Sequence, residues 1–291
     1  VRGSACLGLR LGMTPLLTGL TLVAFGTSAP ELVVSFQAAL SGKGGLAVGN
    51  VVGSNICNIA LILGLSTLIR PIEVESRLVR HDLPVMLISA LVLTIMLLDG
   101  ELSRIDSGIL LLGLVAFVLF TVRDSRAPRK MVREEFTHAV GGRRLPLWLT
   151  LTLMVGGMSL LVWGGRLFVD GAIGISAALG IAPAVIGLSV AAVGTSLPEL
   201  ATSVIAAMRG YGNMAAGNVI GSNIFNILMV LGVSGMVIPL DRGGVTLFDL
   251  GVMLVFCAVC LRLLATHGAM ERWEGAALLA GFLGYMAWLF A

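Results

Sequence analysis

The stretch VAFGTSAPEL, Val23–Leu32, decides the fold because it places a proline and a glutamate side by side inside an apolar segment. The same combination returns as AAVGTSLPEL, Ala191–Leu200. A proline inside a helix has no N–H to donate and its ring crowds an earlier carbonyl, so the helix breaks or kinks. A carboxylate deep in an apolar segment is costly and usually marks an ion path. Two copies of this combination indicate a duplicated functional element.

The composition around these stretches is that of a membrane protein. The 291 residues are 57% hydrophobic and 12% charged, with a mean hydropathy of +1.00, whereas soluble domains carry about 25% charge. Several charge-free runs reach the ~20 residues that a helix needs to cross a bilayer, and they lack the alternation of membrane strands. We predict nine helical spans: 13–40, 46–68, 83–98, 105–123, 147–169, 182–208, 214–238, 245–265 and 274–290.

An internal repeat relates the two ends of the chain. At an offset of 168, which places Gly26 over Gly194, 24 of the 41 positions in 26–66 are identical to their counterparts in 194–234. The repeat includes GNVVGSNICNI from Gly49 and GNVIGSNIFNI from Gly217. A gap-free match of this length indicates two homologous halves.

The same offset predicts how the halves are oriented. Span 147–169 has no counterpart, so we expect the first helix of repeat 1 to be absent from this chain. Restoring it gives five helices per repeat, and an odd number places the repeats in opposite orientations. The predicted fold class is an all-α polytopic membrane protein of two inverted-topology repeats of five helices. The first repeat covers 1–123 and the second 147–291, with a basic loop, 124–146, between them.

The basic residues predict the orientation in the membrane. With loop 124–146 in the cytoplasm, 15 of the 19 lysines and arginines lie inside, as the positive-inside rule expects. The net charge of +3 therefore reflects topology and predicts no nucleic-acid partner. The loop is too short for a regulatory domain. We predict a multi-pass protein of a bacterial or archaeal inner membrane, with no obligate protein partner.

The cysteines and histidines predict no resident cofactor. Cys257 and Cys260 form a C-x-x-C inside an apolar run without a second pair, which favours packing over metal or redox chemistry. The three histidines lack metal-ligand spacing.

Of sixteen acidic residues, only Glu31 and Glu199 lie deep in apolar segments. One such residue could be a protonated carboxyl that holds helices together, but its duplication favours an ion site. The neighbouring Pro30 and Pro198 should break their helices, and free carbonyls are tolerated at membrane depth only beside a cavity or an ion. Hydroxyl groups adjoin each break: Thr27, Ser28, Thr195 and Ser196.

The next helix in each repeat carries a polar stripe. Its members are spaced at i, i+4 and i+8 and share one helix face; a small-residue packing face is the alternative interpretation. Together with the glutamates, they supply only hard oxygen ligands, which suit Ca²⁺, Na⁺ or K⁺ rather than zinc or copper. Two carboxylates balance one Ca²⁺ or two Na⁺, as an exchange requires. The stripes are Asn50, Ser54 and Asn58 in the first repeat, and Asn218, Ser222 and Asn226 in the second.

The paired motifs GTSAPE…GNVVGSNICN and GTSLPE…GNVIGSNIFN resemble the two alpha-repeats of the Ca²⁺/cation antiporter superfamily, in particular its prokaryotic sodium/calcium exchangers. The resemblance covers the chain as a helical layout. It implies ten transmembrane helices and alternating access. It also implies Ca²⁺ ligands at Glu31, Glu199, Thr27 and Thr195, flanking Na⁺ sites at Ser28, Ser196, Ser54, Ser222 and the carbonyls of Ala24 and Ala192, and a central ring completed by Asn58 and Asn226.

One feature of this chain departs from that pattern. Some relatives carry an aspartate at one of the positions matched by Asn58 and Asn226, and this chain has asparagine at both. One negative charge fewer leaves the coupling ion open between Na⁺, H⁺ and K⁺.

The leading hypothesis is a secondary antiporter that exports Ca²⁺ and admits Na⁺ across the lipid bilayer. A Ca²⁺/H⁺ or K⁺-linked antiporter on the same fold is the first alternative, and a passive cation channel is the second. We predict no enzyme, because no histidine lies near a candidate nucleophile.

Overall fold

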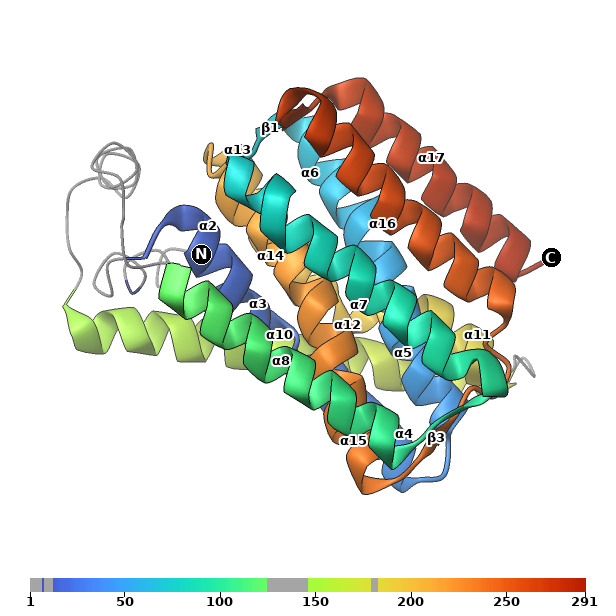
Figure 1. Ribbon diagram of the computed structural model, residues 1–291. Helices are drawn as coiled ribbons and strands as arrows, with labels where there is room; N and C mark the ends of the chain where they lie inside the picture. Colours follow the sequence, from blue (N-terminus) through green and yellow to red (C-terminus); the bar gives the residue numbers. More distant parts are fainter. Residues whose placement is uncertain (1–6, 8–12, 125–145, 179–182) are drawn as a thin grey trace.

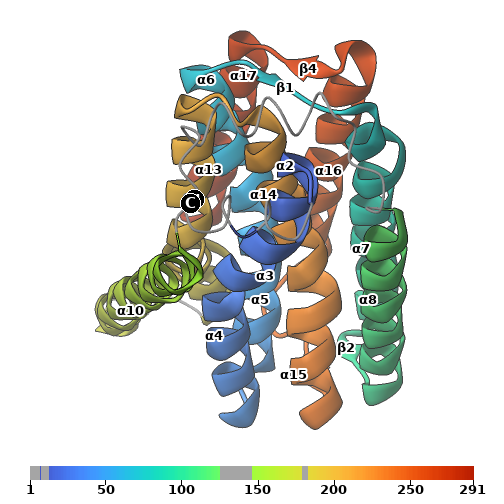
Figure 2. The ribbon, with the colours of Figure 1, turned by 90° about the vertical axis from the view of Figure 1, so that its left-hand side faces the viewer.

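The computed structural model describes residue 7 and residues 13–124, 146–178 and 183–291. Long helices run side by side between two opposite ends of the molecule (Figures 1 and 2). Six of the described helices are long and apolar enough to cross a membrane, and a seventh qualifies if a pair bent by 46° counts as one span. The other two predicted spans correspond to α10 (Leu147–Ala178) and α17 (Arg272–Leu289). The helical membrane architecture is therefore confirmed.

The described part of the first repeat begins with a helix broken near its middle. Its elements are α2 (Pro15–Thr18), the π-helical turn η1 (Gly19–Val23), α3 (Ala24–Thr27), α4 (Ala29–Leu40), α5 (Gly44–Ile56), the π-helical turn η2 (Cys57–Leu63), α6 (Gly64–Ile69), β1 (Ile72–Glu73), the π-helical turn η3 (Leu78–Asp82), α7 (Leu83–Met96), the 3₁₀ turn η4 (Leu97–Asp99), β2 (Glu101–Leu102) and α8 (Arg104–Asp124).

The second repeat follows the same plan after one further helix, α10. Its elements are α10 (Leu147–Ala178), α11 (Pro183–Ile186), the π-helical turn η5 (Gly187–Ala191), α12 (Ala192–Thr195), α13 (Leu197–Met208), α14 (Gly212–Phe225), the π-helical turn η6 (Asn226–Leu231), α15 (Gly232–Val237), β3 (Leu240–Asp241), α16 (Leu247–His267), β4 (Ala269–Met270) and α17 (Arg272–Leu289). The predicted spans match these bounds within a few residues, except that α10 continues to Ala178 rather than ending at 169.

Two short β-ribbons show the symmetry between the repeats. Strand β1 pairs with β4, with Ile72 opposite Met270, and β2 pairs with β3, with Leu102 opposite Leu240. An offset of 168 converts the first pair into the second, and the ribbons lie at opposite ends of the bundle (Figures 1 and 2). Each ribbon joins one repeat to the other. The arrangement is that of two inverted repeats, whose pseudo-two-fold axis would lie in the plane of the membrane.

The turns between helices obey the same symmetry. Gly42 and Gly210 have positive φ values, as do Gly100 and Gly268, and the sequence offset between the repeats relates the members of each pair. A left-handed residue ends a helix, and glycine adopts this conformation without a steric penalty. The duplicated sequence therefore dictates duplicated turns as well as duplicated helices.

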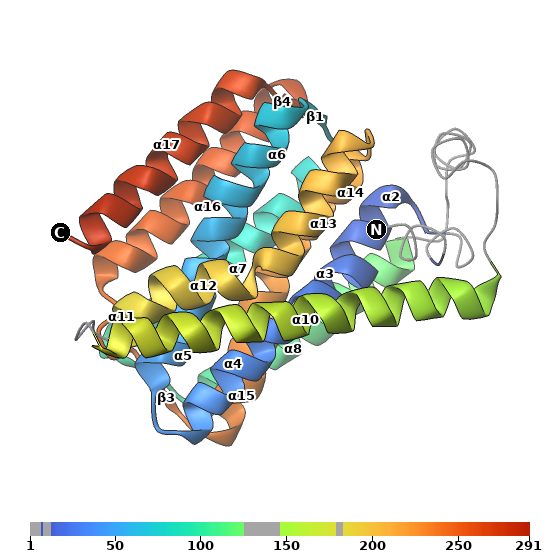
Figure 3. The same ribbon diagram turned by 180° about the vertical axis from the view of Figure 1, so that it is seen from behind.

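The middle of the bundle consists of the two helices that carry the polar stripes. In an apolar 18-residue stretch of each helix, about 78% of the residues are buried within Gly44–Ile69 and 89% within Gly212–Val237, against 22% of Arg104–Thr121. The stripe helices are therefore enclosed by protein, whereas α8 lies at the outside of the described bundle. Helix α10 crosses the back of the bundle over α12, α13, α3 and α4 (Figure 3).

Glycines bring each stripe helix against the broken helix of the other repeat. A methyl group at Gly53 would lie 2.5 Å from the carbonyl oxygen of Leu188, and one at Gly221 would lie 2.7 Å from that of Leu20. Only glycine permits backbones to approach so closely. The two repeats therefore interlock at the level of the predicted ion site.

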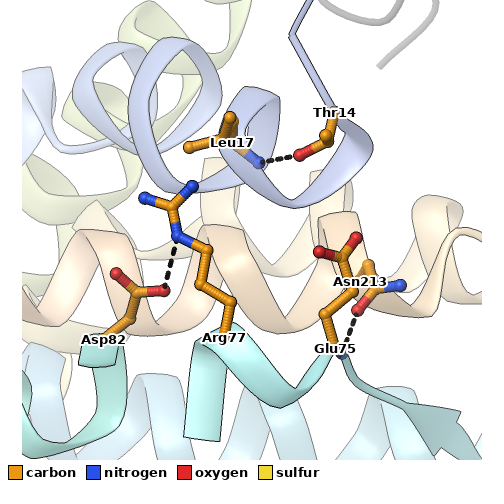
Figure 4. A network of polar contacts seen from close by, with 6 residues as sticks. All are labelled: Thr14, Leu17, Glu75, Arg77, Asp82 and Asn213. Atoms are coloured by element: carbon orange, nitrogen blue, oxygen red, sulfur yellow. Dashed lines mark hydrogen bonds and ion pairs between the residues drawn. The ribbon is translucent and has the colours of Figure 1, made fainter. Parts of the chain in front are cut away.

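A separate polar network lies at the end of the bundle that carries β1 (Figure 4). The backbone N–H of Glu75 donates to Asn213 Oδ1 at 2.8 Å, and Arg77 lies 3.9 Å from Asp82. The first contact attaches the segment between β1 and α7 to the start of α14, and the second lies within that segment. The network joins the two repeats at this end and is distinct from the predicted ion site.

Candidate functional site

Both helices that carry the repeated motif break near the predicted proline, but at a serine two residues before it. Ser28 separates α3 from α4, and Pro30 occupies the first turn of α4. Ser196 and Pro198 take the same positions at the start of α13. Proline is tolerated in a first turn because the N–H that it lacks has no helical partner there. The serine, rather than the proline, is therefore the residue at each break.

The π-helical turns are a feature that the sequence did not predict. Turns η1 and η5 directly precede α3 and α12, whereas η2 and η6 begin at Cys57 and Asn226. The π-helical geometry is rare and often occurs at functional sites, where it re-aims neighbouring side chains. Its appearance at four symmetric positions around the motifs marks the same region as the glutamates do.

Glu31 and Glu199 are fully buried and interact electrostatically with each other. Each carboxylate accepts a hydrogen bond from the serine at the opposite break. Ser196 Oγ donates to Glu31 Oε1 at 3.1 Å, and Ser28 Oγ donates to Glu199 Oε1 at 3.4 Å. Ser222 Oγ also donates to Glu199 Oε1, at 3.2 Å. The axis between the repeats thus brings together two motifs that lie in opposite halves of the sequence.

The second oxygen of each carboxylate is available for a ligand. Among the described residues, Oε2 of Glu31 and Oε2 of Glu199 have no hydrogen-bond partner. No ion pair in this part of the chain joins either glutamate to a lysine or arginine. Two buried carboxylates without a fixed counter-charge are unfavourable unless cations or protons neutralise them.

The motif threonines contact the polar stripe of the other repeat. Thr27 Oγ1 donates to Asn218 Oδ1 at 3.3 Å and lies 3.4 Å from Ser222 Oγ. Thr195 Oγ1 donates to Asn50 Oδ1 at 3.2 Å and lies 3.4 Å from Ser54 Oγ. Because a hydroxyl has one proton and two lone pairs, each threonine keeps lone-pair capacity for a cation.

The carbonyls of Ala24 and Ala192 are less free than the helix break predicts. Ala24 O accepts the N–H of Ser28 at 2.9 Å, and Ala192 O accepts that of Ser196 at 3.0 Å. Ser54 Oγ also donates to Ala192 O, at 3.5 Å. Both carbonyls lie beside the predicted hydroxyl ligands, but each already has a protein donor.

The amide nitrogens of Asn50 and Asn218 donate hydrogen bonds to hydroxyl groups on the preceding helix of the same repeat. The amide nitrogen of Asn50 donates to Ser35 Oγ at 3.0 Å. That of Asn218 donates to Ser203 Oγ at 2.8 Å and to Thr202 Oγ1 at 3.0 Å. These bonds turn the amide oxygens toward the motif threonines. The two repeats differ here, because the counterpart of Thr202 in the first repeat is Val34.

Four asparagines form a cross-linked group between the stripe helices. Asn58 Nδ2 donates to Asn223 Oδ1 at 3.0 Å, and Asn226 Nδ2 donates to Asn55 Oδ1 at 3.2 Å. Asn55 and Asn223 also donate to each other's backbone carbonyls, each at 3.4 Å. Asn55 and Asn223 were missed in the prediction of site residues, although their repetition in the GSN segments of both stripes was a visible signal.

The amide oxygens of Asn58 and Asn226 complete the candidate site. Both residues are fully buried, and within the described part of the chain neither Oδ1 has a hydrogen-bond partner. No group of three or more His, Cys, Asp or Glu residues that could hold a metal occurs among these residues. The available donors are carboxylate, amide and hydroxyl oxygens, which suit Ca²⁺ and alkali cations.

A separate cavity of about 1000 Å³ lies behind the first break. It is open on one side and lined by η1, α3, α8, α10, α14 and η6, and its lining is mostly apolar, including Phe25, Leu114 and Trp163. A desolvated cation requires oxygen ligands. The cavity is therefore a poor candidate for the ion site, which is defined by the buried oxygen atoms.

Comparison with known proteins shows the family to which the chain belongs. The family described as sodium/calcium exchanger protein matches residues 1–123 and 149–291. The chain belongs to this family. It is therefore a multi-pass membrane transporter of the cation/Ca²⁺ exchange class and not an enzyme.

Individual relatives match over nearly the whole chain. Sodium/calcium exchanger MaX1 of Methanosarcina acetivorans is 34% identical, covering 100% of this chain and 93% of that protein. Inner membrane protein YrbG of Escherichia coli is 38% identical, covering 96% and 87%. A structure of the sodium-calcium exchanger NCX_Mj, soaked with Na⁺ and Ca²⁺, is 34% identical with a TM-score of 0.80, covering 98% of this chain and 90% of that one.

Proposed function

We propose that this family member exchanges Ca²⁺ for Na⁺ at one central site between the repeats. The observation that carries the proposal is the pair of buried carboxylates, Glu31 and Glu199, each with an oxygen that has no partner among the described residues. Their combined charge matches one Ca²⁺ or two Na⁺. Neither charge is balanced by a basic side chain in that part of the chain.

The proposed Ca²⁺ ligands come equally from both repeats. The carboxylates supply the charge, and the motif threonines and stripe amides supply neutral oxygens. Six to eight oxygen ligands are usual for Ca²⁺, so ligands contributed symmetrically by two repeats suit the ion well. The proposed Ca²⁺ ligands are Glu31, Glu199, Thr27, Thr195, Asn58 and Asn226.

Sodium would use the same carboxylates together with the flanking hydroxyls. Ser28 and Ser222 both contact Glu199, so a cation bound between them would also meet a carboxylate oxygen. The symmetric position in the other repeat has Ser196 against Glu31 and Ser54 against Ala192 O. The proposed Na⁺ ligands are Ser28, Ser196, Ser54, Ser222 and the carbonyl oxygens of Ala24 and Ala192, which would exchange a hydroxyl donor for the cation.

Exchange, rather than passive flow, follows from the cost of an empty site. Two close carboxylates in a low-dielectric interior repel each other unless cations or protons neutralise them. The protein can therefore change which side of the membrane the site faces when cations or protons fill it. The same change with an empty site is energetically unfavourable. Inverted repeats provide two equivalent ways of opening such a site. This argument favours an antiporter over the channel alternative.

The cytoplasmic placement of loop 124–146 stays a prediction.

The test uses purified protein in proteoliposomes loaded with Na⁺. We expect ⁴⁵Ca²⁺ uptake when Na⁺ flows outward and little uptake when choline replaces Na⁺. Uptake driven by a pH gradient without Na⁺ would instead show proton coupling, and a requirement for K⁺ would show K⁺ linkage. Flux that needs no counter-ion would contradict exchange.

Variants of the two glutamates test the site itself. Glu31→Gln and Glu199→Gln each remove one charge at constant shape, and we expect either change to abolish uptake. The matched control is Glu101→Gln, the same chemical change at an exposed position in β2. Persistent Na⁺-driven uptake in both glutamine variants would show that the ions bind elsewhere.

A further inference from the structure

We propose that Asn55 and Asn223 are positioning residues that fix the orientation of two carboxamide ligands across the pseudo-two-fold axis. The proposal rests on the function proposed above, because it concerns the same site. Each asparagine acts on the ligand of the opposite repeat: Asn55 on Asn226, and Asn223 on Asn58.

A carboxamide needs such a partner because its two ends have opposite polarity. The oxygen of Asn58 or Asn226 can bind a cation, whereas the NH₂ group repels it. A carboxylate has no such ambiguity, since its two oxygens are equivalent. A site that uses amides at these two positions therefore requires groups that select one of the two amide orientations.

The observed hydrogen bonds make that selection. Asn223 Oδ1 accepts from Asn58 Nδ2 at 3.0 Å, and Asn55 Oδ1 accepts from Asn226 Nδ2 at 3.2 Å. Because the NH₂ groups of Asn58 and Asn226 bond to Asn223 and Asn55, their amide oxygens point away from these two residues. Neither oxygen has a hydrogen-bond partner among the described residues, although both side chains are fully buried.

The positioning residues are themselves firmly held. Asn55 Nδ2 and Asn223 Nδ2 donate to the backbone carbonyl of the other residue. Asn55 Nδ2 also lies 3.9 Å from Met253 Sδ, and Asn223 Nδ2 lies 3.5 Å from Met86 Sδ. With their nitrogens engaged, both residues present their oxygens to the ligand amides. Such outer contacts of a metal ligand are typically worth about 10- to 100-fold in metal affinity.

The test is a set of double-mutant cycles measured as the Kd for Ca²⁺ of the purified protein. We expect Asn55→Ala to raise the Kd at least about tenfold in the wild-type background. In an Asn226→Asp background the same change should cost less than about twofold, because a carboxylate needs no orienting partner. In an Asn58→Asp background, which adds the same charge, Asn55→Ala should again raise the Kd for Ca²⁺ at least about tenfold.

The mirror variant provides a second measurement if Asn55→Ala does not fold. Asn223→Ala should weaken binding in the wild-type and Asn226→Asp backgrounds, and have little effect in the Asn58→Asp background. Equal losses in all backgrounds, for whichever variant folds, would mean that the asparagines only support packing, and this inference would be wrong. A wild-type protein that binds no Ca²⁺, or binds it equally well after Glu31→Gln, would instead overturn the proposed function.

Discussion

The close approach at Gly53 allows a prediction whose size follows from the structure. A methyl group there would lie 2.5 Å from the carbonyl oxygen of Leu188, whereas ordinary contacts begin at 3.4 Å. In Gly53→Ala, α5 and η5 must therefore separate by about 3.4 − 2.5 = 0.9 Å. Overpacking of this kind costs about 1–3 kcal/mol of stability.

The same displacement should reach the ion site. Ser54, the next residue, lies 3.4 Å from Thr195 Oγ1, so the shift moves one set of proposed ligands away from the other. A misplacement of about 1 Å can cost roughly 100-fold in the rate of a reaction that depends on alignment. We expect Gly53→Ala to lower Na⁺-driven Ca²⁺ uptake by about 10- to 100-fold.

The assay combines thermal unfolding in detergent with ⁴⁵Ca²⁺ uptake in proteoliposomes. Gly251→Ala and Gly284→Ala are matched controls, because a methyl group at either position meets no heavy atom within 4 Å. Gly221→Ala should resemble Gly53→Ala, since its methyl would lie 2.7 Å from Leu20 O. If Gly53→Ala is as stable and as active as the controls, the packing argument is refuted.

Further predictions concern polar contacts away from the glutamates. Ser35→Ala removes the acceptor of the Asn50 amide, so we expect a several-fold rise in the KM for Ca²⁺. Thr202→Val should change it less than about twofold, because Ser203 still accepts from the Asn218 amide at 2.8 Å. Tyr285→Phe removes a bond of 2.8 Å to Asp249 and should cost about 1.5–3 kcal/mol of stability without changing the KM; thermal unfolding and uptake kinetics test these effects.

The fold could be predicted because its two strongest signals can be read from the sequence without knowing which segments pack together. Charge-free runs mark the helices, and the self-match at an offset of 168 marks the repeat. The ribbons confirm that repeat, since the pairing of Ile72 with Met270 becomes that of Leu240 with Leu102. The inverted arrangement also explains why Ser28 reaches Glu199 and Ser196 reaches Glu31.

The features that were missed depend on contacts between distant segments. The π-helical turns depend on how the helices pack, and the hydrophobic pattern carries no signal for them. Asn55 and Asn223 were overlooked because the stripe was sought at a spacing of i, i+4 and i+8, which selects one helix face. Their oxygens act across the axis, on the opposite repeat. Only the packing of the stripe helices shows which asparagines meet.

The asparagines of the proposed site also determine how much charge it can balance. An aspartate supplies charge and needs no orientation, whereas an asparagine supplies a neutral oxygen and must be held the right way round. With Asn58 and Asn226 neutral, Glu31 and Glu199 are the proposed ligands that carry charge, so the site balances two positive charges. A flux ratio of two Na⁺ for each Ca²⁺ would leave it neutral in both loaded states. Measuring ²²Na⁺ and ⁴⁵Ca²⁺ fluxes together at clamped voltage tests this balance, and a ratio of three would show that a net positive charge crosses with Na⁺.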